Sequence, residues 1–191
     1  MLTDLLLLVL ETVLGFFSLV LLARFCMQWA RVSFRNQVGQ FVVALTDWIV
    51  VPTRRLIPGL LGLDLASLIM AWLTQTLLVL AELWLRGFSF GQAAAVGVLV
   101  ILAIGLTETV KVMIWLLIGV VIVAAVLSWV SPYSALAPLF NAMARPFLRP
   151  FQRIVPPIAN VDLSPLVLLL VLQIVLMSLA YLRSAFLTLA V

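Results

Sequence analysis

Four long apolar stretches dominate the pattern of hydrophobic and polar positions along the chain. Each holds about 20 residues with few polar side chains, and they run from Leu5 to Ala23, Leu65 to Leu85, Val112 to Val130 and Leu163 to Leu182. At a rise of about 1.5 Å per residue, a helix of this length crosses the roughly 30 Å hydrocarbon core of a bilayer. The pattern therefore predicts an all-α membrane protein with about four transmembrane helices.

The loops that follow the first and third stretches carry the pattern of an amphipathic helix. Apolar residues recur there at i, i+3, i+4, i+7 and i+11, which is the spacing of one helical face. Such a helix lies flat at the membrane interface, and Asn36 and Ser134 stand where its N-cap belongs. Prolines then bracket an arginine in residues 52–58 and 150–156, which predicts that neither helix continues through these segments. The apolar stripes are Val38, Phe41, Val42, Leu45 and Ile49 in the first loop and Leu136, Leu139, Phe140, Met143 and Phe147 in the second.

These two loops and the stretches after them repeat one another at a constant offset of 98 residues. A repeat nearly half the chain long indicates a two-unit architecture. We expect a single membrane domain, residues 1–191, with repeat one over about 2–86, a linker over 87–111 and repeat two over about 112–187. The aligned pairs include Pro52 and Pro150, Arg55 and Arg153, Asp64 and Asp162, Gln75 and Gln173 and, after a two-residue slip, Trp29 and Trp129.

Residues 93–106 form a shorter, fifth apolar stretch within the linker. As a helix it would reach only about 21 Å, less than a span requires, and Glu108 and Lys111 separate it from Val112. It fits a short buried or re-entrant helix, the first part of one long bent helix that continues to Val130, or a fifth span. A fifth span would place the two repeats in opposite orientations.

The basic residues favour four spans over five. Of the eleven Lys and Arg residues, seven lie in the two repeat loops, and the positive-inside rule places such loops in the cytoplasm. Four spans keep both loops on that side, with both termini facing away from the cytoplasm and the repeats parallel. Five spans would export one loop. The seven residues are Arg31, Arg35, Arg54 and Arg55 in the loop 29–63 and Arg145, Arg149 and Arg153 in the loop 131–162.

Four of these arginines, Arg54, Arg55, Arg149 and Arg153, are candidate functional residues. As ordinary juxtamembrane residues they set the topology and attract anionic lipid head groups by about 1 kcal/mol each. The alternative is a docking surface for a soluble acidic partner.

The composition excludes a soluble domain and most kinds of catalysis. Hydrophobic residues make up 66% of the chain and charged residues 9%, and the mean hydropathy is +1.33, outside the range of soluble domains. The chain has no histidine and one cysteine, Cys26, which removes His/Cys metal sites, histidine-based catalysis and an intramolecular disulfide. No P-loop or glycine-rich nucleotide turn is present. We expect no enzyme activity, no metal or cofactor and no direct nucleic-acid binding.

Polar residues at the ends and in the middle of the predicted spans are further candidates. Asp64 and Asp162 open the second and fourth spans, where an aspartate caps a helix; a cation site built from both carboxylates is the functional alternative. Gln75 and Gln173 lie about 16 Å further into the bilayer, so each should face protein rather than lipid. Across a pseudo-twofold axis they would act as helix–helix hydrogen-bonding points or line a polar conduit.

Glu11 stands mid-way along the first span without an obvious partner. A buried acid there costs several kcal/mol if it is ionised, so we expect it to be paired or protonated. Arg24, more than three turns away on the same helix, is not its partner. Glu82 and Arg86 form an i, i+4 pair at the end of the second span.

Four motifs resemble the YggT (YlmG) family of bacterial inner-membrane proteins. They are Arg-Phe-x-x-Gln-Trp at 24–29, Pro-x-Arg-Arg-x-Ile-Pro-Gly with Asp-Leu-Ala-Ser at 52–67, Ser-Trp-Val-Ser-Pro-Tyr at 128–133, and Pro-Phe-x-Arg-Ile-Val-Pro-Pro with Asp-Leu-Ser-Pro within 146–165. The resemblance implies a two-repeat protein of the inner membrane without assigned catalysis. It also implies links to osmotic or ion tolerance or to cell division in bacteria, and to cytochrome b assembly and nucleoid distribution in chloroplasts.

Two classes of function follow from these observations. The first is a non-catalytic membrane scaffold or assembly factor that presents two basic loops to a cytoplasmic protein or to anionic lipid. The second is a small channel or transporter for ions or solutes, which would need a homo-oligomer because four or five short helices enclose little volume. The first class is supported by the position of the most elaborate motif, at the interface rather than in the spans. The second is supported by the repeat and by Glu11, Gln75 and Gln173. Arg24 is a further candidate functional residue.

Overall fold

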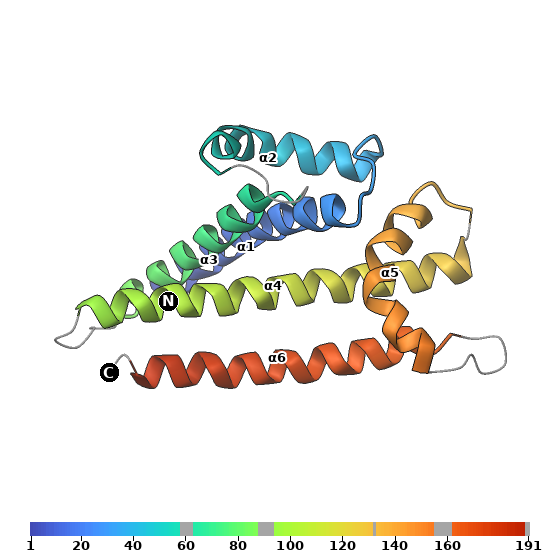
Figure 1. Ribbon diagram of the computed structural model, residues 1–191. Helices are drawn as coiled ribbons and strands as arrows, with labels where there is room; N and C mark the ends of the chain where they lie inside the picture. The colour runs from blue at the N-terminus through green and yellow to red at the C-terminus, as the bar shows by residue number, and fades with distance from the viewer. Residues whose placement is uncertain (58–62, 88–93, 132, 155–161, 190–191) are drawn as a thin grey trace.

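The computed structural model describes residues 1–57, 63–87, 94–131, 133–154 and 162–189, and across them the chain is all-helical (Figure 1). This confirms the predicted fold class. The helices are, in order, α1 (Leu2–Trp29), α2 (Gln37–Leu56), α3 (Leu65–Leu85), α4 (Ala94–Val130), α5 (Ala137–Ile154) and α6 (Ser164–Leu189).

Four of these helices, α1, α3, α4 and α6, are long and apolar enough to cross a membrane, as the sequence predicts. Their outer surfaces remain apolar: Leu8, Leu99 and Ile174 are 60%, 67% and 63% exposed, which suits lipid and not water. α6 is the least covered, because 11% of its most apolar segment is buried against 28% in each of the other three. One face of α6 is therefore available to lipid or to another chain.

The short apolar stretch 93–106 is not a separate helix. From Ala94 onward it forms the first part of α4, a continuous helix of 37 residues that is about 55 Å long. The polar residues after this stretch do not break the helix. The hydroxyls of its two threonines are hydrogen-bonded to backbone carbonyls of the preceding turn. Thr107 donates to the carbonyl of Ala103 at 2.9 Å and Thr109 to that of Gly105 at 2.7 Å.

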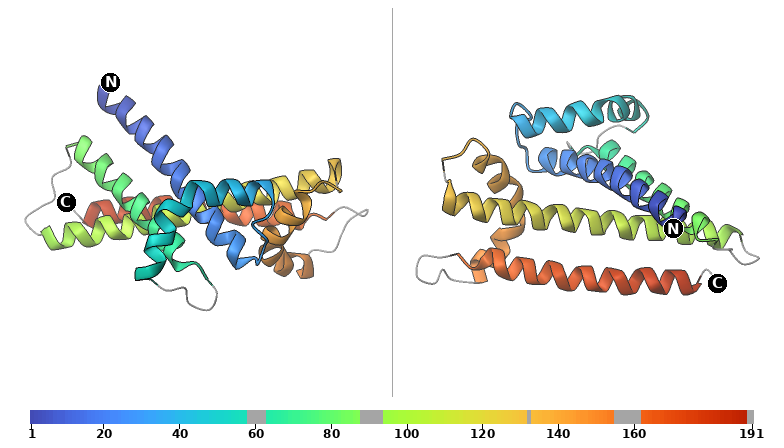
Figure 2. Two further views of the ribbon diagram at one scale, coloured as in Figure 1. Left: turned by 90° about the horizontal axis from the view of Figure 1, so that it is seen from above. Right: turned by 180° about the vertical axis from the view of Figure 1, so that it is seen from behind.

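α4 joins the two halves of the molecule. It packs against α3 and α1 on the side of repeat one and against α6 and α5 on the side of repeat two (Figures 1 and 2). The largest apolar cluster includes Met27 of α1, Val121 of α4, Ala144 of α5 and Leu168 of α6. Burial of these side chains holds both repeats in one unit.

The close approach of α3 and α4 requires Gly105. A Cβ at this position would lie 2.9 Å from the Cα of Thr76, closer than packed carbon atoms approach. Nearby, the indole nitrogen of Trp72 donates to the carbonyl of Leu102 at 3.1 Å, which further ties the two helices together.

α2 and α5 are the predicted loop helices; α2 begins at its predicted cap, whereas α5 begins at Ala137, three residues after Ser134. Asn36 Oδ1 accepts from the backbone N–H of Gly39 at 2.7 Å, and Ser134 Oγ accepts from that of Ala137 at 3.2 Å. The apolar stripe of α5 faces the core of the molecule, where Leu139 and Met143 are buried. α2 lies over α1 and α3, whereas α5 crosses beside α4 and α6 (Figure 1).

The prediction that prolines end these two helices is wrong for the described residues. α2 continues through Pro52 to Leu56, and α5 continues through Pro146 and Pro150 to Ile154. Each proline removes one backbone hydrogen bond and bends the helix without ending it; the bend of α2 is visible in Figure 2. The outer prolines of the two motifs, Pro58 and Pro156, lie outside the described residues.

We predict that Gly105→Ala lowers the thermal unfolding midpoint of the detergent-purified protein, since overpacking typically costs about 1–3 kcal/mol. Gly119→Ala is the matched control, because a Cβ there meets no atom within 4 Å. The control should be neutral or mildly stabilising through helix propensity. Equal midpoints for the two variants would show that α3 and α4 are not in close contact.

Candidate functional site

Arg24 lies near the end of α1 and is only 5% exposed. Its Nη1 donates to the hydroxyl of Thr46 at 2.6 Å and to the carboxylate of Asp47 at 2.7 Å, both on α2. Its Nε lies 3.4 Å from Asp64 Oδ2, just before α3. A guanidinium in this apolar setting requires such partners, because an unpaired buried charge is costly.

Asp64 also binds a second arginine. Arg54 of α2 donates from Nη2 to Oδ2 at 2.6 Å and from Nε to Oδ1 at 3.1 Å, a two-point contact. The hydroxyl of Ser67 donates to Oδ2 at 2.6 Å, and Arg54 Nη2 also reaches Gln28 Oε1 at 3.3 Å. Asp64 is 2% exposed and stands at the predicted N-cap position of α3, but its side chain makes no cap hydrogen bond to the helix.

We call Arg24, Asp47, Arg54 and Asp64 the repeat-one ion cluster. Burial alone would raise the pKa of Asp64, but the hydrogen bonds from Arg54 and Ser67 and the charges of both arginines outweigh it. The pKa of this carboxyl therefore lies below its ordinary value, and the pKa of Arg54 is raised by the same hydrogen bonding. Two cations and two anions neutralise one another, and together they fasten α2 to α1 and α3.

Asp162, the equivalent of Asp64 in repeat two, has a different environment. Its Oδ1 accepts from the backbone N–H of Ser164 at 2.8 Å, as a helix cap does, and its Oδ2 accepts from Gln152 Nε2 at 2.9 Å. Burial raises its pKa, but these hydrogen bonds lower it by more, so the carboxylate stays ionised at neutral pH. Asp64 and Asp162 share no hydrogen-bonding partner among the described residues.

A second group of charges, the cross-repeat ion cluster, links α3, α4 and α6. Arg183 Nη2 of α6 lies 2.6 Å from Glu82 Oε2 of α3, and its Nη1 lies 3.4 Å from Glu108 Oε1 of α4. Lys111 pairs with Glu108 at 2.8 Å, and the predicted Glu82–Arg86 pair is present at 3.4 Å. Local sequence spacing did not identify Arg183 as a partner of Glu82, although charged residues within apolar spans generally require an oppositely charged partner.

The two glutamines have different surroundings. Gln75 is 3% exposed and faces protein, as predicted. Gln173 lies on the exposed face of α6, so the prediction that it faces protein is wrong within a single chain, and the two do not form a buried pair. Glu11 is exposed on α1 and makes no ion pair with any described residue.

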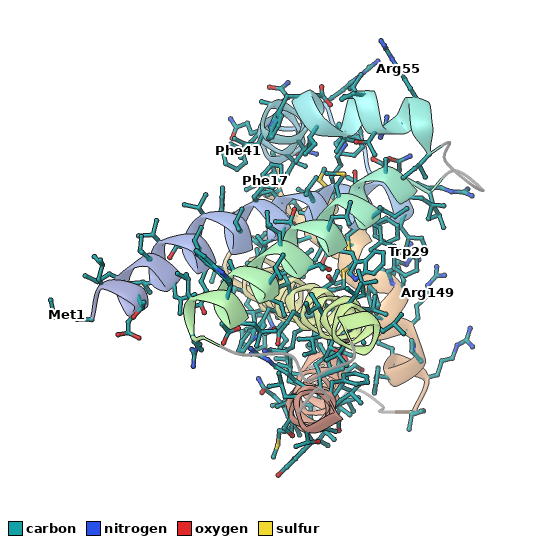
Figure 3. The ribbon with its side chains drawn as sticks, turned by 90° about the vertical axis from the view of Figure 1, so that its left-hand side faces the viewer. Met1, Phe17, Trp29, Phe41, Arg55 and Arg149 are labelled. Atoms are coloured by element: carbon teal, nitrogen blue, oxygen red, sulfur yellow. The ribbon has the colours of Figure 1, made fainter. Side chains whose placement is uncertain are left out.

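The candidate residues are therefore divided between a half-buried ion cluster and the outer surface. Arg24, Arg54 and Asp64 meet in the repeat-one ion cluster, whereas Arg55, Arg149 and Arg153 are exposed. Figure 3 shows Arg55 and Arg149 extending outward from α2 and α5. Among the described residues, no group of three or more Cys, Asp or Glu side chains could hold a metal ion.

Four apolar spans and two helices outside them, in two similar halves, define a multi-pass helical membrane protein. The sequence pattern of the family described as CCB3/YggT matches residues 3–85 and 103–183, and the chain belongs to this family. It is 33% identical over 169 residues to a Pseudomonas aeruginosa protein, covering 87% of this chain and 84% of the relative. It is 33% identical over 181 residues to YggT of Escherichia coli K12, covering 90% of this chain and 87% of the relative.

A Haemophilus influenzae protein is 29% identical over 157 residues, covering 81% of this chain and 80% of the relative. The names of these three relatives assign no activity or ligand. No solved structure matches the chain.

We predict that Arg24→Met lowers the free energy of unfolding by about 1.5–3 kcal/mol, because it removes the charged hydrogen bonds to Thr46 and Asp47, whereas Asp64 keeps its contacts with Arg54 and Ser67. Arg86→Met is the control: its side chain is 64% exposed, and exposed pairs contribute only about 0–1 kcal/mol. Thermal unfolding in detergent, with folded yield as a second measure, distinguishes them. An Arg24 variant as stable as the Arg86 variant would contradict a structural role for the cluster.

Proposed function

We propose that this protein is a non-catalytic scaffold or assembly factor of the bacterial inner membrane that presents a basic surface to the cytoplasm. The main observation is that six of the seven loop arginines are exposed and form no ion pair with any described residue. An arginine kept only for internal stability would be paired, as Arg24 is. The six are Arg31, Arg35, Arg55, Arg145, Arg149 and Arg153.

The helices that carry this surface are held firmly against the spans. The repeat-one ion cluster fastens α2 to α1 and α3, and burial of Leu139, Met143 and Ala144 fastens α5. A rigid platform loses little conformational entropy when it binds a partner, which favours recognition over simple charge attraction.

A suitable partner carries negative charge. Anionic lipid head groups would gain about 1 kcal/mol for each arginine near the surface, and a soluble acidic protein would gain through complementary potential and faster association. Recruitment of such a protein is compatible with the roles in osmotic tolerance, division or cytochrome assembly that the family resemblance implies.

A small oligomeric channel or transporter is the second candidate. The observation that favours it is that Glu11 and Gln173 are polar and exposed on otherwise apolar spans. In lipid these groups would lack hydrogen-bonding partners, and further copies of the chain would supply them.

We predict that both repeat loops face the cytoplasm, because they carry seven arginines between them. Single cysteines at Gln40 and Asn141, in a Cys26→Ala background, should resist a membrane-impermeant thiol reagent added to intact cells and react after lysis. Labelling of one site from outside would demonstrate oppositely oriented repeats.

Neutralising the surface tests the scaffold directly. In Arg145→Gln, Arg149→Gln, Arg153→Gln protein, we expect unchanged folded yield and loss of the proteins that co-purify from native membrane in mild detergent. Arg86→Gln, at the far end of α3, controls for general loss of positive charge and should retain them. Undiminished recovery from the triple variant would contradict the proposal.

Flux measurements separate the two candidate functions. Reconstituted wild-type protein should give no ion or solute flux above protein-free vesicles, and Gln75→Leu, Gln173→Leu protein should fold and behave alike, since membrane side-chain hydrogen bonds contribute on average only about 0.6 kcal/mol. An active parent beside a folded but inactive double variant would establish the channel instead.

A further inference from the structure

The repeat alignment places Ala124 of α4 at the position of Arg24 in α1. The offset of 100 that aligns Trp29 with Trp129 also aligns these two residues. Burial agrees with this register at three matched positions, although Leu22 and Ile122 differ, at 0% and 45% exposed. Exposed fractions are 3% and 5% for Val20 and Val120, 0% for both Leu21 and Val121, and 5% and 4% for Arg24 and Ala124.

Repeat two therefore lacks both guanidinium groups that surround the aspartate in repeat one. Ala124 replaces Arg24, and at the offset of 98 Gln152 replaces Arg54 while Asp162 matches Asp64. Asp64 is 2% exposed beneath its two arginines, whereas Asp162 is exposed. Repeat two thus has the aspartate but lacks the two arginines that cover it in repeat one.

A cavity occupies this place in repeat two. Its volume is about 410 Å³, and it lies between α4, α5 and the start of α6. Ala124 forms part of its wall, and its polar lining comes from Ser128, Asn141, Gln152 and Asp162. Apolar side chains, including Val121 and Leu169, line the remainder.

Asp162 has no positively charged partner within the chain. All eleven Lys and Arg side chains belong to the described residues, and no ion pair joins any of them to Asp162. Its carboxylate is held by two neutral donors, Ser164 and Gln152. A carboxylate at a mostly apolar cavity, without a cation of its own, attracts a cation from outside the chain.

We propose that this cavity binds a primary ammonium group, seated beside Asp162 where repeat one holds its own guanidinium groups. An ammonium has three N–H donors, and the carboxylate, the Ser128 hydroxyl and the amide oxygens of Asn141 and Gln152 offer separate acceptors for them. The apolar wall then covers the carbon chain attached to the ammonium. A divalent metal ion fits less well, since it would require several oxygen ligands and the cavity has one carboxylate.

Such a group is supplied either by the head of an aminophospholipid or by a soluble amine. The test uses delipidated, full-length protein in detergent and measures the thermal unfolding midpoint against three probes. These are phosphatidylethanolamine, phosphatidylcholine with the same acyl chains, and putrescine. The trimethylated head of phosphatidylcholine keeps the charge and removes the N–H donors.

We expect phosphatidylethanolamine or putrescine to raise the midpoint, with phosphatidylcholine giving little change. A response to the lipid alone assigns a membrane source, and a response to putrescine assigns a soluble one. In Asp162→Asn, half-saturation should require roughly tenfold more of the active probe, because a hydrogen bond to a charged group is lost. Asp4→Asn removes a carboxylate that is 81% exposed near the N-terminus and should leave the response unchanged.

Ala124→Arg provides the decisive variant. The new guanidinium should pair with Asp162 as Arg24 contacts Asp64, raise the midpoint without any probe and abolish the probe response. Because this variant places a guanidinium at the position that matches Arg24, it tests the ammonium site even if Asp162→Asn fails to fold. Equal responses to the two phospholipids, no response to any probe, or an undiminished response in Ala124→Arg would overturn the proposal.

Discussion

A buried guanidinium in an apolar bundle requires a carboxylate, and this requirement organises the first half of the molecule. Arg24, in the last two turns of α1, points toward α2 and is only 5% exposed, so water cannot solvate its guanidinium. Its contacts with Thr46, Asp47 and Asp64 draw α2 and the start of α3 to the same point. Because an unpaired charge there would be strongly destabilising, the position of α2 follows from the position of Arg24.

The two halves share a backbone plan but differ in the chemistry at this junction. In repeat one, charge compensation is internal, with two arginines matched to two aspartates. In repeat two, α5 is held by apolar burial of residues such as Leu139 and Ala144, and Asp162 keeps only neutral hydrogen-bond donors. Both repeats therefore have the same order of helices, but at this junction repeat one is held by ion pairs and repeat two contains an open cavity.

The sequence predicted what depends on local pattern and length. The four spans, the two amphipathic helices and the cap at Asn36 follow from hydrophobic run length, helical spacing and side-chain chemistry, each within a segment of about twenty residues. The proline rule failed at Pro52 and Pro150 because a helix packed against neighbours can tolerate the loss of one hydrogen bond. The exposure of Gln173 and the Arg183–Glu82 pair depend on which helices pack together, across 101 residues in the second case, and local spacing does not contain that information.

We infer that the repeat-one ion cluster, in addition to the burial of Val42 and Val50, fixes α2 to the spans. Hydrogen–deuterium exchange of the full-length protein in detergent tests it most directly, comparing wild type with Arg24→Gln. Loss of the cluster should accelerate exchange across residues 37–56, while exchange across 137–154, held by apolar burial, stays at the wild-type rate. Unchanged protection of α2 in the variant, or an equal loss in both helices, would contradict the account.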